Sequence, residues 1–394
     1  MAASGRKFLL AIGLILGCTG QEVKVSAPAA NGGIGDTTSS GGGKAITLSV
    51  TPSLATISVN ATVQLMGILR DTLGGALGDL ITWSTSNSAV ATVNSSGLVT
   101  GTGVGTTTIN AALAGTIDLG GDLTVNRFGF GAMRITGEGI WGEPQDREEC
   151  KRVLRRTLEL GINLIDTADA YGPEVSERLI AETLHPYPDD LVIATKGGLT
   201  RPGPARWNPD GRPVHLRAAC EGSLKRLRVD QIDVYQFHRP DPQVPFEESV
   251  GALVQLKNEG KIRHIGLSNV TTDQLEQAQK LTPIVSVQNR YNLFDRSSEG
   301  VLEACSLEEI AFIPWRPVEG GELSEAGGAL ADIARRNRAT PSQVALAWLL
   351  AHSPVMLPIP GTSKVAHLEE NLGAVALDLP PADLAELDKV AVES

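Results

Sequence analysis

Three apolar segments of the sequence end in, or run directly into, a side chain that can carry or share a proton. Ile162–Asp166 ends in a carboxylate, Leu191–Thr195 runs into Lys196, and Ile232–Phe237 runs into His238. If these segments are parallel strands, their carboxyl ends meet at one end of a barrel and the three groups lie together there. Taken singly, a strand-end aspartate is more often a helix cap, and a lone histidine is more often structural. It is their repetition along the chain that predicts a site.

Tyr171 adds a phenol to this set, because it follows Asp166 in the loop after the strand. A lysine cation next to a phenol favours the phenolate, so we expect Lys196 to lower the pKa of Tyr171 from its usual value of about 10. The Asp166 carboxylate would keep the lysine charged and in place. Together with His238, these groups predict a site that donates a proton.

Apolar segments of strand length alternate with amphipathic segments between residues 115 and 394. The expected strands are Arg127–Met133, Ile162–Asp166, Leu191–Thr195, Ile232–Phe237, His264–Ser268, Val285–Gln288, Ala311–Trp315 and Val355–Ile359. Between them, apolar residues recur every three or four positions, as in helices with one inward face. This α/β pattern predicts a (β/α)8 TIM barrel over residues 115–394, with its active site at the C-terminal ends of the strands.

The segments LIDTADAYG, VIATKGG, DVYQFHRPD, IRHIGLSN and VQNRYN resemble the aldo-keto reductases in order and in spacing. The resemblance implies that an aldehyde or ketone is reduced to an alcohol by hydride transfer from NAD(P)H. It implies that Tyr171 donates the proton and that Lys196, held by Asp166, makes this proton available, while His238 orients the carbonyl. FGFGAMRITGEGIWG and HLEENL further resemble a bacterial branch that includes pyridoxal reductases, so pyridoxal is the first substrate to test.

The same resemblance implies where the cofactor binds. Ser268, Asn269 and Gln288 would hydrogen-bond the nicotinamide carboxamide, and Trp315 would stack on the nicotinamide ring. A helix N-terminus with free backbone N–H groups and a lysine suits a phosphate. The adenosine side would be formed by Gly361, Thr362, Ser363, Lys364, Glu370 and Asn371. We expect NADP, and NAD stays open because His367 stands where the family often has an arginine.

Two features near the expected mouth of the barrel concern ligands. Trp141 and Trp207, with Tyr291, suggest a partly aromatic substrate pocket. Residues 137–142 match the G-x-G-x-x-G pattern of dinucleotide-binding loops, but no helix opens at the third glycine, as that motif requires. We therefore expect a loop that lies over the barrel mouth.

Residues 1–18 resemble a bacterial lipoprotein signal peptide: two cations, an apolar run too short to span a membrane, and a small residue before Cys18. Residues 19–45 are rich in Gly, Ser, Thr and Ala, which indicates a flexible linker. These features predict an exported protein that contacts the membrane only through a lipid on Cys18. The alternative is a cytoplasmic reductase to which the N-terminal segments have been joined, because its reduced cofactor is found there.

Residues 46–114 change to short segments in which apolar and polar residues alternate between Gly, Asn and Ser turns, which predicts a small all-β sandwich. TWSTSNSAVATV and GLVTGTGVGTTTI resemble the bacterial immunoglobulin-like domain of group 2. The last strand of such a domain would fall in TIDLGGDLTVNRFGFG, which is equally the opening hairpin of the reductase. Because this domain could bind a surface glycan or protein, the alternative function is an anchored binding protein with a silent barrel.

Composition limits the remaining possibilities. The chain of 394 residues has a formal charge of -11, and its Lys and Arg residues are scattered, so nothing suggests a nucleic-acid partner. Cys150, Cys220 and Cys305 fall on expected helices without the spacing of metal ligands. We expect buried thiols and no metal.

Overall fold

The computed structural model describes residues 12–13, 22–26, 47–52, 54–70, 76–77, 81–85, 87–93, 97–107, 109–113, 115–318 and 328–390. The chain divides into two compact units, Met1–Gly115 and Thr116–Ser394. Among the described residues, no helix is long and apolar enough to cross a membrane. Cys18 lies outside the described residues, so the lipid anchor stays a prediction.

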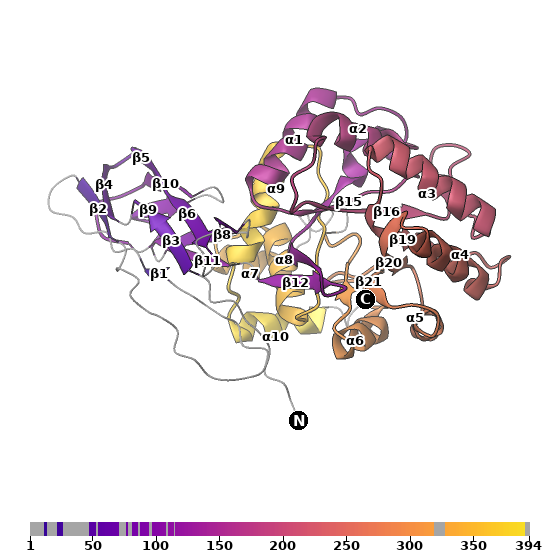
Figure 1. The fold of residues 1–394 in the computed structure, drawn as a ribbon. Helices are drawn as coiled ribbons and strands as arrows, with labels where there is room; N and C mark the ends of the chain where they lie inside the picture. Colours follow the sequence, from indigo (N-terminus) through magenta and orange to yellow (C-terminus); the bar gives the residue numbers. More distant parts are fainter. Residues whose placement is uncertain are drawn as a thin grey trace. The chain divides into compact units, whose positions relative to one another are not determined.

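The N-terminal unit consists of short antiparallel strands in small sheets (Figure 1). Its strands are β1 (Ile12–Gly13), β2 (Glu22–Ser26), β3 (Thr47–Thr51), β4 (Leu54–Ser58), β5 (Thr62–Gln64), β6 (Met66–Arg70), β7 (Ala76–Leu77), β8 (Ile81–Thr85), β9 (Ala91–Val93), β10 (Leu98–Gly101) and β11 (Ile109–Leu113). The sheets have the orders β1-β11-β8, β5-β10-β9, β3-β6-β7 and β2-β4. Burial alternates along β10, where Val99 is fully buried, as the period-two sequence pattern predicts.

The second unit is a barrel of parallel strands surrounded by helices (Figure 1). In sheet order its strands are β14 (Phe130–Gly131), β15 (Leu164–Asp166), β16 (Val192–Gly197), β19 (Ile232–Phe237), β20 (Ile262–Ser268), β21 (Ile284–Gln288) and β22 (Ala311–Phe312). Its helices are α1 (Arg147–Glu159), α2 (Val175–Leu184), α3 (Pro213–Leu227), α4 (Phe246–Asn258), α5 (Thr272–Gln279), α6 (Glu299–Leu307), α7 (Ala329–Arg336), α8 (Pro341–His352), α9 (Val365–Leu372) and α10 (Pro381–Val390). The predicted α/β barrel class is confirmed.

The eighth expected strand, Val355–Ile359, is not a regular strand, although this segment still closes the barrel. Phe312 N donates to Val355 O at 2.9 Å on one side, and Gly129 N donates to Pro358 O at 3.0 Å on the other. Pro358 and Pro360 have no N–H group to donate, so the ladder of hydrogen bonds is interrupted. The sequence pattern predicted the position of this segment correctly but not its regularity.

Three further expected strands are shorter than predicted: β15 begins at Leu164 rather than at Ile162, and two others are reduced to two residues each. Of Arg127–Met133, only the two residues of β14 pair as a strand, because the chain then turns into a short 3-10 helix at Ala132–Ile135. Of Ala311–Trp315, only β22 is regular, since Pro314 cannot donate a hydrogen bond.

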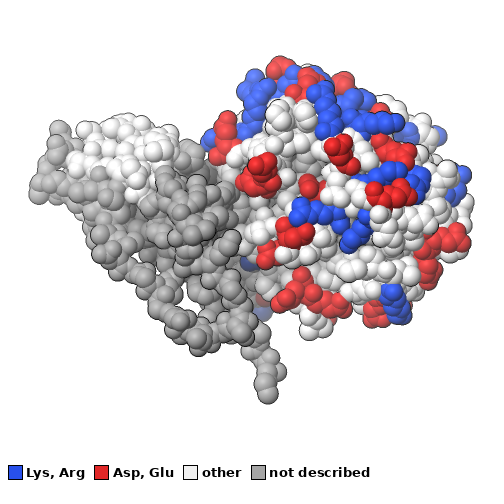
Figure 2. Space-filling view, in the orientation of Figure 1, with Lys and Arg blue, Asp and Glu red and all other residues white. Residues whose placement is uncertain are grey.

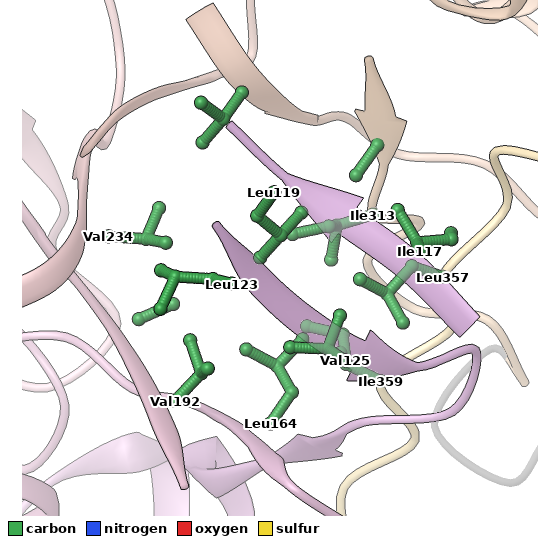
Figure 3. Close-up of a cluster of buried hydrophobic side chains, with 13 residues drawn as sticks. Ile117, Leu119, Leu123, Val125, Leu164, Val192, Val234, Ile313, Leu357 and Ile359 are labelled. Atoms are coloured by element: carbon green, nitrogen blue, oxygen red, sulfur yellow. The ribbon is translucent and has the colours of Figure 1, made fainter. Parts of the chain in front are cut away.

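An antiparallel hairpin, β12 (Thr116–Leu119) and β13 (Leu123–Asn126), precedes the barrel strands. Figure 3 shows its apolar side chains pointing toward those of the strands; the cluster contains Ile117, Leu119, Leu123, Val125, Leu164, Val192, Ala194, Val234, Val285, Ala311, Ile313, Leu357 and Ile359. In the turn, Asp122 Oδ1 lies 2.6 Å from His264 Nε2 of β20. The hairpin therefore packs into the barrel core.

The covering helices follow the predicted pattern. Leu216, Cys220 and Leu227 of α3 are fully buried, as are Val250 and Leu253 of α4. Cys150 and Cys305 are also buried free thiols, and burial raises the pKa of the Cys305 thiol to about 12. Buried thiols are therefore confirmed on these helices.

Charged side chains of both signs are interspersed over the barrel unit on the face drawn in Figure 2. Many form exposed pairs, such as Arg217 Nη1 with Glu259 Oε2 at 2.6 Å. Each exposed pair of this kind contributes only about 0–1 kcal/mol to stability.

Candidate active site

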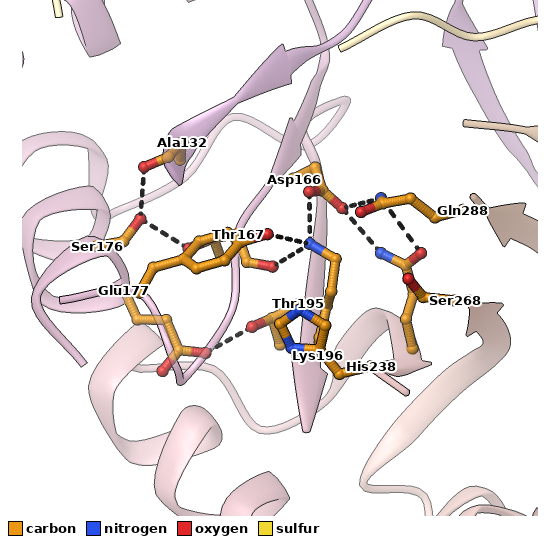
Figure 4. A network of polar contacts seen from close by, with 12 residues as sticks. Ala132, Asp166, Thr167, Ser176, Glu177, Thr195, Lys196, His238, Ser268 and Gln288 are labelled. Carbon is orange, nitrogen blue, oxygen red and sulfur yellow. Dashed lines mark hydrogen bonds and ion pairs between the residues drawn. The ribbon is translucent and has the colours of Figure 1, made fainter. Parts of the chain in front are cut away.

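The four predicted groups meet at the C-terminal ends of neighbouring strands. Lys196, in β16, is fully buried, and its Nζ donates to Asp166 Oδ1 at 2.6 Å, to Thr167 O at 2.9 Å and to Tyr171 OH at 3.2 Å. Figure 4 shows this ammonium group at the centre of the network. The Tyr171 and His238 rings meet edge to face with centroids 5.9 Å apart. A lysine with three acceptors has no freedom to turn elsewhere.

Asp166 is held by Gln236 and Gln288, and the sequence did not predict this role for either residue. Its second oxygen, Oδ2, accepts hydrogen bonds from Gln236 Nε2 and Gln288 Nε2, both at 2.8 Å. Gln236 lies two residues before His238, and successive side chains of a strand alternate sides, so its spacing was a detectable signal. Gln288 was expected to bind the nicotinamide, but here its amide nitrogen is engaged by Asp166.

The loop that carries Tyr171 is anchored to the start of α2. Ser176 Oγ lies 2.8 Å from Thr167 Oγ1 and donates to Ala132 O at 3.1 Å. Next to it, Glu177 Oε1 accepts from Thr195 Oγ1 at 2.6 Å (Figure 4). These buried contacts fix the position of the loop relative to the strands, and none of them was predicted from the sequence.

Burial decides the protonation of Tyr171. Burial raises the pKa of the phenol above its ordinary value, and the Lys196 cation offsets only part of this increase. Lys196 lowers this pKa, as expected from the sequence, but the net pKa of the resting phenol is raised, because the cost of a buried phenolate exceeds the attraction of one cation that Asp166 already pairs. Burial alone would lower the pKa of Lys196, but Asp166 and Tyr171 outweigh it, so that pKa is raised. The resting site holds a neutral phenol and a charged lysine.

His238 is neutral. Burial lowers its pKa well below the ordinary value, and the nearby cations Lys196, Arg239 and Arg201 lower it further. Its Nδ1 is buried and has no hydrogen-bond partner among the described residues. Such a buried ring nitrogen is a polar group that the folded protein leaves unsatisfied.

The strand ends beyond His238 form a second group of polar contacts. Asn269 Nδ2 donates to His238 O at 2.9 Å and to Ser268 Oγ at 3.0 Å, and Asn269 Oδ1 accepts from Trp315 Nε1 at 3.1 Å. Asn269 therefore links three strand ends. The Ser268 hydroxyl is buried and accepts from Asn269, so its own proton can serve a ligand.

Comparison with known proteins identifies this arrangement. Residues 127–392 match the aldo/keto reductase family, and residues 45–116 match the bacterial Ig-like domain of group 2. An uncharacterized oxidoreductase of Schizosaccharomyces pombe is 52% identical over 281 residues, which cover 71% of this chain and 91% of that protein. The chain belongs to the aldo/keto reductase family.

Two further relatives bear on this reductase. Pyridoxine 4-dehydrogenase of Escherichia coli is 43% identical over 279 residues, which cover 69% of this chain and 97% of that protein. A solved aldo/keto reductase of Klebsiella pneumoniae, in complex with NADP and acetate, is 26% identical with a TM-score of 0.60, covering 70% of this chain and 95% of that one.

In this reductase the start of α9, where a phosphate was expected, is partly occupied by the protein itself. Glu149 of α1 accepts the Val365 N–H through Oε1 at 3.0 Å, and the Lys364 N–H is taken by Thr362 Oγ1 at 3.1 Å. The Val365 hydrogen bond is the main reason that the pKa of Glu149 is lowered, and Arg152 and Lys364 contribute. The expectation of wholly free backbone N–H groups is therefore wrong at this helix end.

The remaining expected adenosine residues differ in their surroundings. Gly361 and Ser363 are partly exposed, and Lys364 is exposed. Glu370 is exposed, whereas Asn371 is buried. A ligand on the surface of α9 can reach Glu370 directly but not Asn371 without a local adjustment.

Two of the three aromatic residues predicted for a substrate pocket lie close to Tyr171 and its loop. Trp207 lies edge-on to Tyr171 and to His238, at centroid distances of 6.4 and 6.5 Å. Trp141 bridges Gly172 in the loop after Tyr171. Arg201 was not predicted from the sequence, and its guanidinium carbon lies 3.5 Å from the centroid of the Trp207 ring.

Tyr291 does not belong to this pocket. It is fully buried, stacks on Trp348 with ring centroids 6.1 Å apart, and its hydroxyl lies 2.9 Å from His352 Nε2. The prediction that Tyr291 lines the aromatic pocket is therefore wrong, and the residue belongs to the core beneath α8.

The glycine-rich loop at residues 137–142 is no dinucleotide loop. It forms a short 3-10 turn at Glu138–Ile140, and Gly142 N donates to Gly172 O at 2.7 Å. The next helix, α1, begins only at Arg147. The predicted loop over the strand ends is confirmed.

Proposed function

We propose that the barrel catalyses the reversible, NADP(H)-dependent reduction of an aldehyde to an alcohol, with pyridoxal or a similar aromatic aldehyde as substrate. The observation that carries the proposal is the position of Lys196 Nζ between Asp166 Oδ1 and Tyr171 OH, at 2.6 and 3.2 Å. A neutral phenol beside a fixed cation is a proton donor whose conjugate base is stabilised as it forms.

The residues around the strand ends fit a nicotinamide cofactor. The unpaired Nδ1 of His238 and the buried hydroxyl of Ser268 offer polar groups to a ligand, and Trp315 offers an aromatic face. Lys364, before α9, would meet a phosphate. When bound, the reduced nicotinamide supplies the hydride. NADP in the Klebsiella relative supports the choice of NADP over NAD.

The side chains of the site then have separate tasks. Tyr171 donates its proton to the carbonyl oxygen as negative charge develops there. Lys196 stabilises the tyrosinate that remains, and Asp166, with its two glutamine partners, keeps the ammonium group in place. His238, being neutral, can orient the carbonyl without competing for the proton.

The aromatic side of the site favours an aromatic substrate. Trp207 and Trp141 flank the Tyr171 loop, so a planar ring can pack against them while its aldehyde faces the phenol. The likeness to a pyridoxine 4-dehydrogenase supports pyridoxal as the aldehyde and pyridoxine as the alcohol.

The test uses the full-length chain. Tryptophan fluorescence is titrated with NADPH and with NADH, and NADPH oxidation is followed at 340 nm with pyridoxal and with benzaldehyde. We expect saturable binding with a Kd on the order of micromolar and turnover of pyridoxal. Absence of binding and of turnover with both cofactors would contradict the proposed function.

We propose further that the mature protein begins at Cys18 and is exported with a lipid anchor. The order of cations, apolar run, small residue and cysteine in residues 1–18 supports this. Labelled fatty acid should enter the wild type and not Cys18→Ser, which should also leave the membrane fraction. Equal labelling of both proteins would contradict the lipid anchor and favour a cytoplasmic enzyme.

A further inference from the structure

Arg201 is held in place beside the substrate side of the site. It directly follows the short strand β17 (Leu199–Thr200). Its guanidinium carbon lies 3.5 Å from the centroid of the Trp207 ring and 5.5 Å from that of Trp141. Its Nη1 donates to Ala170 O at 2.9 Å. Two aromatic rings and one carbonyl therefore fix the cation without neutralising it.

The hydrogen-bonding capacity of Arg201 is only partly used. Among the described residues, the acceptors of Arg201 are backbone carbonyls and no carboxylate pairs with it, and its Nε is buried with no hydrogen-bond partner. Its Nη2 makes only a 3.5 Å contact with Gly139 O. In a guanidinium group, Nε and Nη2 present two parallel donors along one edge, which matches the oxygens of a carboxylate or phosphate. That edge, whose Nε is covered by the protein in this structure, is the part of Arg201 with donors that the protein leaves unsatisfied.

The position of Arg201 associates it with substrate rather than with cofactor. Its hydrogen-bond acceptor, Ala170, immediately precedes Tyr171, and its charge is one of those that lower the pKa of His238. The groups that fit the nicotinamide, Ser268 and Trp315, lie on the other side of His238 along the sheet, at the end of β20 and after β22. An anion on Arg201 would therefore be part of a molecule whose carbonyl lies at Tyr171.

We propose that Arg201 binds an anionic group on the carbonyl substrate, so that the preferred substrates are aldehydes that carry a carboxylate or a phosphate. This inference rests on the proposed function and narrows its substrate class. The inference requires that the Trp207 and Trp141 rings hold the guanidinium group in a position to bind substrate. The alternative is that Arg201 only stabilises the packing of these loops.

A matched pair of aldehydes tests the proposal: 4-carboxybenzaldehyde and its neutral methyl ester, methyl 4-formylbenzoate. We expect wild type to prefer the carboxylate in kcat/KM by about 10-fold or more, the usual worth of a hydrogen bond to a charged group. Arg201→Gln should lose about 10- to 100-fold on the carboxylate, mainly in KM, and far less on the ester. Arg201→Lys should recover part of the loss, and added salt should weaken only the carboxylate.

The control is Arg206→Gln, because Arg206 is exposed on the same loop; it should keep the wild-type preference. A comparison of kcat/KM for pyridoxal 5′-phosphate and pyridoxal tests a phosphate in the same way. A preference for either charged aldehyde supports the anion site and shows which anion it binds. If Arg201→Gln lost kcat/KM equally on the acid and on the ester, the proposal would be overturned, and Arg201 would have only a structural role.

A binding measurement separates this proposal from the proposed function. Terephthalate, which cannot be reduced, is titrated against tryptophan fluorescence of wild type and Arg201→Gln. Binding that needs Arg201, without any aldehyde turnover, would retain the anion site and contradict the reductase function. Turnover of the neutral ester without any preference for the acid, and no terephthalate binding, would retain the reductase and overturn the anion site.

Discussion

The strand-end cluster around Lys196 and the start of α9 are both places where the sequence predicts a lysine acting on a ligand, and they differ sharply. Lys196 is fully buried, and its ammonium group donates hydrogen bonds to Asp166, Thr167 and Tyr171. Lys364 is exposed, and the nearest backbone donor of the helix is taken by Glu149. The groups around Lys196 are thus preorganised by the protein. At the start of α9, by contrast, a ligand must displace the Glu149 carboxylate from the Val365 N–H. We therefore expect mutations to have large effects at the first place and graded effects at the second.

The largest effect is expected for Tyr171→Phe, which removes the proton donor from the preorganised cluster. The rate of carbonyl reduction should fall by about 10²- to 10⁴-fold, while NADPH binding measured by fluorescence stays nearly unchanged. Stopped-flow measurement of NADPH oxidation checks this. A variant that kept more than about a tenth of the wild-type rate would show that another group is the acid.

A direct comparison of the two lysines comes next. Lys196→Met leaves the Asp166 carboxylate buried without its cation and should lower the free energy of unfolding by about 3–5 kcal/mol. Lys364→Ala, the exposed counterpart, should change it by less than about 0.5 kcal/mol. Urea denaturation measures both. Adding Asp166→Asn to Lys196→Met should restore part of the stability, and failure to do so would mean that packing rather than charge holds the cluster.

The graded response at α9 is tested by coenzyme affinity. Lys364→Ala should weaken NADPH by about 3- to 10-fold and NADH much less, because only NADPH has a 2′-phosphate to meet the cation. Glu149→Gln should act in the opposite direction, since it removes a negative charge that competes for the Val365 N–H. Fluorescence titrations at two salt concentrations give the dissociation constants of both coenzymes for the wild type and for each variant. Unchanged NADPH affinity in both variants would place the phosphate elsewhere.

The smallest effect concerns Asp169, a carboxyl near the cluster that lacks the partners of Asp166. Burial is the main cause that raises its pKa to about 8, Glu177 adds to it, and its Oδ1 is unpaired among the described residues. Because the folded state then binds a proton that the unfolded state has released, stability should fall as pH rises from about 4 to about 8.

Asp169→Asn should remove this dependence, so its stability relative to wild type should increase across that pH range. Thermal denaturation at several pH values measures it, with Asp230→Asn on the surface as control. A constant difference between Asp169→Asn and wild type would show that Asp169 is ionised in the folded protein.

The sequence by itself determined the barrel and its reacting groups. Alternation of apolar runs with amphipathic segments requires layered strands and helices, and parallel strands must bring their ends together. Asp166, Tyr171, Lys196 and His238 therefore lie together for reasons that are visible in their positions along the chain. Sequence also located the closing segment at Val355–Ile359, but its prolines made it irregular.

The tertiary structure alone decided what surrounds these groups. The sign of the pKa shift of Tyr171 depends on how completely the loop is buried, which no local pattern encodes. Gln236 and Gln288 hold Asp166, and Glu149 reaches Val365 from 216 positions away in the chain, because folding places them there. Side chains at strand ends are ordered by the backbone itself, whereas contacts between distant elements depend on packing, and packing sets the protonation and the ligand preference of this site.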